Sequence, residues 1–83
     1  MEINQYFEAE VRHAARDLMG HYNFMGGYQP GSFRTALFSL WERADRSNKF
    51  KLAQAFPAEG AAIEALESQG ESGLRRLAEA NNV

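Results

Sequence analysis

The sequence predicts a small all-α protein, a single-domain bundle of four to five helices organised around a central helical hairpin. Apolar residues recur at spacings of three and four, which is the period of one helix face. Glycine, proline, serine and aspartate separate these segments at positions that suit helix starts and stops. No segment carries the pattern of a strand. With 83 residues the chain suits one domain, which we place at residues 1–83.

The first helix is predicted over about residues 4–19. Gly20 is expected just beyond its last turn, because glycine adopts a left-handed cap conformation without steric cost. The apolar face of this helix comprises Ile3, Phe7, Val11, Ala14 and Leu18.

Residues 20–31 are expected to form an ordered loop of unusual composition. Four glycines and one proline lie among large side chains, namely Tyr22, Phe24, Met25 and Tyr28. Two roles are open for these large residues: they close the core between the first two helices, or they form an exposed apolar patch for a partner. Residues 29–32 predict a type II turn with Gly31 at positive φ.

The second helix is predicted to begin with Ser32 as its N-cap residue. Its apolar stripe is wide enough to suggest packing on two sides. If the ring of Phe33 were buried, Phe33→Ala would cost roughly 3–5 kcal/mol. The stripe comprises Phe33, Leu37, Leu40, Trp41 and Ala44, with Phe38 beside it.

A third helix is predicted over about residues 48–55, with Asp45 or Ser47 as its cap. Pro57 ends this helix or opens the next, because proline suits a first helical turn. The side chains expected to point inward are Leu52, Ala53 and Phe56.

The last third of the chain predicts a fourth helix at about 58–68 and a fifth at 72–80, while residues 81–83 are expected to fray. Gly60 indicates either a close helix contact or a weak helix start, and Gly70 suits the residue after the fourth helix. Ala62, Ile63 and Leu66 are expected to be buried, and Glu59, Glu64 and Glu67 to face water.

No pattern in the sequence indicates catalysis or a cofactor. The absence of cysteine excludes disulfides and thiolate metal sites. His13 and His21 lack a third ligand, and the glycines of residues 26–31 lack the lysine and the preceding strand of a phosphate loop. We therefore expect no enzymatic activity, no metal and no cofactor.

Charge is unevenly distributed. Four acidic and two basic residues in 1–31, two and five in 32–55, and five and two in 56–83 give local net charges of −2, +3 and −3. Cations beside Trp41 and Phe50 could bind phosphates and stack bases, although these aromatics also suit a core. A solvated face paired with the acidic C-terminal part is the favoured interpretation, and nucleic-acid contact is the alternative. The basic residues concerned are Arg43, Arg46, Lys49 and Lys51.

Residues 26–57 carry a resemblance. They contain Gly-x-Gln-Pro-Gly-Ser-Phe at 27–33, Ala-Asp-x-x-Asn at 44–48 and Ala-Phe-Pro at 55–57. In these motifs the chain resembles a group of short uncharacterised proteins of tailed bacteriophages. The resemblance implies a shared fold more than a shared activity, and a small phage protein made in the cytoplasm of an infected bacterium.

The expected function is therefore binding rather than catalysis. Small phage proteins without catalytic motifs often act on host or phage complexes, and anti-CRISPR inhibitors of bacterial defence belong to this class. No apolar run approaches the ~18 residues of a membrane span, and residues 1–5 lack the features of a signal peptide. The alternatives are a nucleic-acid-binding accessory that uses residues 43–51 and a homo-oligomeric phage component. The predicted partner-binding residues are Tyr22, Phe24, Met25, Tyr28, Glu64, Glu67 and Glu71.

Overall fold

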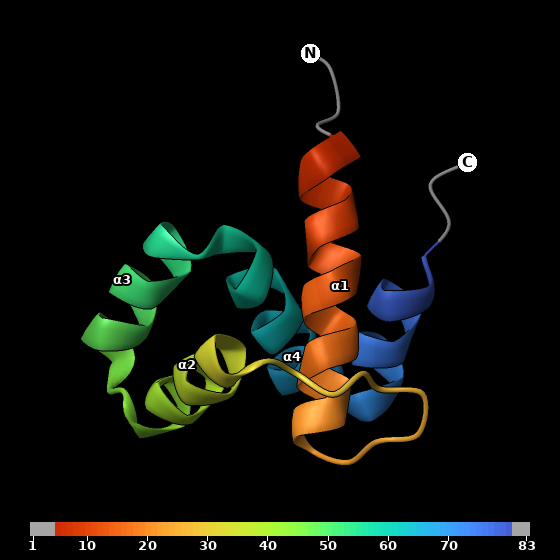
Figure 1. Cartoon of the computed structure of the whole chain (residues 1–83). Coiled ribbons are helices and arrows are strands. Elements are labelled where there is room, and N and C mark those ends of the chain that lie inside the picture. Colours follow the sequence, from red (N-terminus) through yellow and green to blue (C-terminus); the bar gives the residue numbers. More distant parts are fainter. Residues whose placement is uncertain (1–4, 81–83) are drawn as a thin grey trace.

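The structure is a computed structural model that describes residues 5–80, and in this range it is made of helices without strands. The all-α prediction is confirmed. The elements are α1 (Gln5–His21), α2 (Ser32–Arg43), α3 (Arg46–Ala55) and α4 (Pro57–Glu79). Helices α1 and α4 pack along each other as the body of the molecule, and α2 and α3 project to one side as an arm (Figure 1).

The core lies mainly between α1 and α4. Ala14 and Ala62 are completely buried, and their small side chains allow the two helices to approach closely. The predicted inner face of α1 is confirmed at Val11, Ala14 and Leu18, while Phe7 is 38% exposed near the helix start. Ile3 and the predicted start at residue 4 lie outside the described residues.

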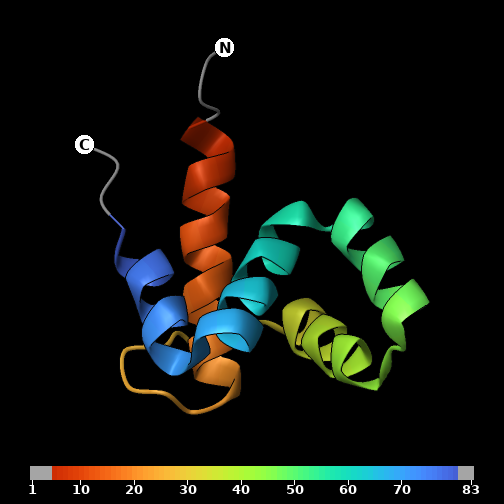
Figure 2. The ribbon, with the colours of Figure 1, turned by 180° about the vertical axis from the view of Figure 1, so that it is seen from behind.

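Gly70 divides α4 into two helical segments. Its φ of 72° lies in a region that glycine reaches without strain, and the helix changes direction there. The second segment therefore packs Leu74 and Ala78 against the core beside α1 (Figure 2). The segments correspond to the predicted fourth and fifth helices. The fraying predicted for 81–83 lies outside the described residues.

The expected role of Gly20 as a cap is wrong, because α1 continues to His21. Glycine is needed at this position for a different reason: the loop crosses α1 here. A Cβ atom on Gly20 would lie 1.6 Å from the carbonyl oxygen of Tyr28, and one on Gly27 would lie 2.2 Å from the Gly20 nitrogen. The Tyr28 amide donates to the Arg16 carbonyl at 2.9 Å, which holds the crossing in place.

The start of α2 differs from the prediction by one residue. Gly31, not Ser32, is the N-cap residue, and its φ of −72° rules out the type II turn that was expected. The buried face of α2 comprises Leu37, Phe38 and Trp41. Packing on two sides is also wrong, because Phe33 is 64% exposed and Leu40 is 52% exposed.

The local signals around α3 and α4 are largely confirmed. The Asp45 carboxylate accepts from the Asn48 amide at 2.9 Å, so α3 begins two residues earlier than predicted. Pro57 opens α4. Gly60 marks a close helix contact, because a Cβ atom there would lie 3.2 Å from the Cβ of Ala53.

Candidate functional site

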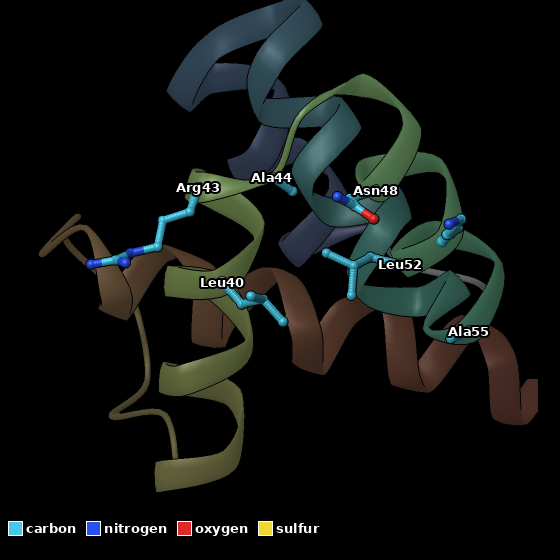
Figure 3. A pocket seen from close by; sticks show the side chains of 7 residues that line it. Leu40, Arg43, Ala44, Asn48, Leu52 and Ala55 are labelled. Atoms are coloured by element: carbon cyan, nitrogen blue, oxygen red, sulfur yellow. The ribbon is translucent and has the colours of Figure 1, made fainter.

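A groove opens between α2 and α3. The two helices are joined by Ala44 and Asp45 alone, yet α2 packs mainly against α1 and α3 against α4. The groove has a volume of about 550 Å³. Leu40 and Leu52 point toward one another across it, and Arg43 extends outward from its rim (Figure 3). It is lined by Leu40, Arg43, Ala44, Asn48, Lys51, Leu52 and Ala55.

The positions of the apolar residues in α2 and α3 explain why the aliphatic floor of the groove is exposed. The face of α2 that carries Phe38 and Trp41 turns toward the body, and this leaves Leu40 on the far side. No residue of α3 is fully buried, and Leu52 is half-buried. The Asp45 cap fixes the corner at which the two helices diverge.

Cations without an internal partner flank this groove. Arg43, Arg46 and Lys51 are exposed, and among residues 5–80 none of them forms an ion pair. Lys49 differs, because its Nζ lies 3.5 Å from the Glu67 carboxylate of α4. The structure therefore divides the predicted basic cluster into three unpaired cations on the arm and one that faces α4.

Of the two aromatic residues that were expected to stack on bases in the nucleic-acid alternative, only one is exposed. Trp41 is 4% exposed and belongs to the core, so it cannot stack on a base, whereas Phe50 is 64% exposed. The residues that line the groove include no aromatic side chain.

The predicted loop patch is dispersed around the end of α1. Phe24 packs against the core, as one alternative held, and Met25 is 84% exposed, as the other held. Tyr22 stacks on Phe24 with 5.9 Å between ring centroids. Tyr28 lies over the guanidinium of Arg16 and lines a different hollow from Tyr22.

Tyr22 belongs to a small polar contact between the loop and α2. Its hydroxyl donates to the Glu42 carboxylate, which also lies 3.2 Å from His21 Nε2. Partial burial and the bond to Glu42 raise the pKa of Tyr22 to about 12. The same bond, supported by His21, holds the pKa of Glu42 below its ordinary value despite some burial. Glu42 is thereby held on the side that faces the loop.

The three predicted acidic contact residues all lie exposed on α4. Two of them are engaged in surface ion pairs: Glu67 with Lys49, and Glu71 with Arg75 at 2.8 Å. Glu64 is exposed one turn before Ser68.

The expectation that Glu59 faces water is wrong, because Glu59 is 7% exposed and binds Arg34. Arg34 Nη2 lies 2.6 Å from the Glu59 carboxylate, and Nη1 lies 3.1 Å from that of Asp17. Nη1 also lies 3.2 Å from His13 Nδ1. This cluster ties α2 to both helices of the body.

Arg34, Asp17 and Glu59 form a saturated structural cluster. Burial by itself lowers the pKa of Arg34, but its hydrogen bonds with Glu59 and Asp17 outweigh this and raise it above the ordinary value. Among the side chains of residues 7–80, every buried nitrogen and oxygen has a hydrogen-bond partner. The sequence held one signal for this cluster, since Asp17 lies beside Leu18 and three residues after Ala14 on the inner face of α1.

Within the described range, no group of three or more His, Cys, Asp or Glu residues could hold a metal ion. Among the same residues there is no helix with the length and apolar character that crossing a bilayer requires. No family model, curated protein or solved structure matches the chain.

Proposed function

We propose that this is a non-catalytic binding protein that contacts a protein partner through the groove between α2 and α3. The observation that carries the proposal is an uncovered aliphatic floor beside cations that have no partner within residues 5–80. Large apolar side chains normally lie inside, and a patch of them with a polar rim is typical of an interaction site. The loop is a weaker candidate because its side chains point to different parts of the surface.

The resemblance to proteins of tailed bacteriophages suggests in which cell the protein acts and on what kind of partner. All the residues that line the groove lie inside residues 26–57, the segment that carries the resemblance. In this setting the protein acts in the cytoplasm of an infected bacterium on a host or phage complex, for example as an anti-CRISPR-like inhibitor of a defence complex.

Nucleic-acid binding is the second candidate, favoured by the unpaired Arg43, Arg46 and Lys51. Three phosphate contacts would give a salt slope no steeper than about −2.7 on a double-logarithmic plot. This candidate ranks lower because the floor of the groove is aliphatic and Trp41 is buried.

Affinity capture from a nuclease-treated bacterial lysate tests the proposed function with matched variants. Leu40→Asp places a charge in the groove, and Met25→Asp places the same charge on an apolar side chain that is more exposed and lies outside it. We expect a stoichiometric protein to be recovered with the wild type and with Met25→Asp, and lost with Leu40→Asp. Recovery that survives Leu40→Asp, or recovery of nucleic acid alone when nuclease is omitted, would refute the proposal.

A further inference from the structure

We infer that the groove receives an acidic amphipathic helix of the partner protein. This inference rests on the proposed function and adds the chemistry of the bound element. Aliphatic anchors of that helix would contact Leu40 and Leu52, and its carboxylates would face Arg43 and Lys51.

The dimensions of the groove suit a short helix. On α3 the lining residues run from Asn48 to Ala55, a rise of about 10 Å at 1.5 Å per residue, and on α2 only Leu40 and Arg43 line the groove. A helix with anchors at positions i, i+3 or i+4, and i+7 spans the same rise of about 10 Å. Ala44 near the closed end and Ala55 near the open end leave depth for anchors beside the two leucines.

The charge of the groove indicates the sign of its occupant. Arg43 and Lys51 line the groove, and Arg46 is the first residue of α3, next to the corner where α2 and α3 meet. The nearest acidic residues in the sequence are engaged elsewhere: Asp45 caps α3, and Glu42 binds Tyr22 and His21. Complementary acidic groups would accelerate association and select against basic segments.

A second copy of the chain fits the groove poorly. An isologous dimer that joined two grooves would bring the cations of both copies together. A contact between the groove of one copy and α4 of another would be reciprocal in a two-fold dimer or head-to-tail in a ring or filament. In each of these arrangements it would compete with the pairs that Glu67 and Glu71 already form. A different protein with an acidic helix meets neither obstacle.

Fluorescence anisotropy with three synthetic helical peptides of roughly three turns tests this inference. The first carries leucines at i, i+4 and i+7 with flanking glutamates, the second replaces the glutamates by lysines, and the third replaces the leucines by serines. We expect the acidic leucine peptide to bind at least about tenfold more tightly than either of the others. Added salt should shrink its advantage over the lysine peptide.

Two lysines of α3 provide the matched control. Lys51→Gln and Lys49→Gln change the net charge equally, but only Lys51 lines the groove, whereas Lys49 pairs with Glu67. We expect Lys51→Gln to weaken the acidic peptide severalfold, Lys49→Gln to leave its affinity unchanged, and Leu40→Asp to abolish binding.

The inference is overturned if no peptide binds, if the lysine peptide binds equally well, or if both glutamine variants behave alike. It is also overturned if an oligonucleotide binds this face and the acidic peptide does not displace it. Each of these results can occur while capture of a protein from lysate still depends on Leu40. Failure of the acidic-helix inference is therefore distinguishable from failure of the proposed function.

Discussion

Removal of the Arg34 side chain is expected to be among the most damaging single changes in this protein. In the wild type the Asp17 and Glu59 side chains are 6% and 10% exposed, and Arg34 hydrogen-bonds to both. Arg34→Ala would leave two desolvated carboxylates without their cation, which costs about 3–5 kcal/mol. A domain of this length has a free energy of unfolding of about 4–12 kcal/mol, from about 0.05–0.15 kcal/mol per residue. The variant should therefore lose a quarter of its stability or more.

Urea unfolding followed by the fluorescence of Trp41 measures this loss, because Trp41 is the single tryptophan and is 4% exposed in the fold. The informative comparison is the triple variant Arg34→Met, Asp17→Leu, Glu59→Met, which removes all three charges together. Replacing a buried ionic cluster by apolar residues of similar shape is often neutral. We expect the triple variant to be more stable than Arg34→Ala.

The matched control is Arg75→Ala, which removes an ion pair with Glu71 whose side chains are 30% and 47% exposed, together with an exposed hydrogen bond to the Met25 carbonyl. Solvent screens the pair and water can replace the donor, so the loss should stay below about 2 kcal/mol. If Arg34→Ala were as mild as Arg75→Ala, the carboxylates around Arg34 would not be desolvated, and the reasoning would fail.

Four further predictions concern the loop, the core, the groove and the Tyr22 contact. Gly20→Ala should destabilise the fold by at least about 3 kcal/mol, because its methyl group would meet the backbone of the crossing loop, and thermal unfolding would show this. Trp41→Ala should cost about 3–5 kcal/mol in urea unfolding, followed for this variant by helical circular dichroism because the fluorescent tryptophan is absent. Leu40→Ala should cost only about 1 kcal/mol there, because Leu40 is already half exposed. Absorbance titration should show one tyrosine that ionises near pH 12 and is absent from Tyr22→Phe. The contact of Tyr22 with Glu42 should therefore stabilise the fold fully below about pH 10 and lose this effect as the pH rises toward 12.

Helix ends could be predicted from the sequence because capping depends on interactions between residues that are close in the chain. Asp45 captures the amide three residues later, Pro57 opens a helix, and Gly70 adopts a positive φ. Gly20 shows the limit of this reasoning. The sequence suggests a helix cap at this position. Glycine is required there instead because the backbone of Tyr28 packs against it, and no local sequence pattern reveals this contact.

The candidate site was harder to predict because exposure depends on which neighbours a helix meets. Phe33 and Leu40 look like core residues in the α2 pattern, yet the buried face is rotated toward Leu37, Phe38 and Trp41. Arg34 shares that face and binds carboxylates on α1 and α4, which favours this orientation of α2. A charged residue that continues a buried face is not a prior expectation, so periodicity alone does not identify which face of α2 is buried.

The residues that stabilise the fold and the proposed binding groove therefore lie on different parts of this small fold. Most of the buried residues lie on α1 and α4, and α2 adds Leu37, Phe38 and Trp41, so substitutions in the groove should leave the fold intact. Arg34 links the two regions, because it pairs with carboxylates on α1 and α4, and we expect these pairs to help to hold Leu40 on the outward side of α2. The triple apolar variant, although folded, lacks this directional constraint and should bind the acidic peptide more weakly than wild type. Equal affinity of the two folded proteins would show that packing around Trp41 alone orients the groove.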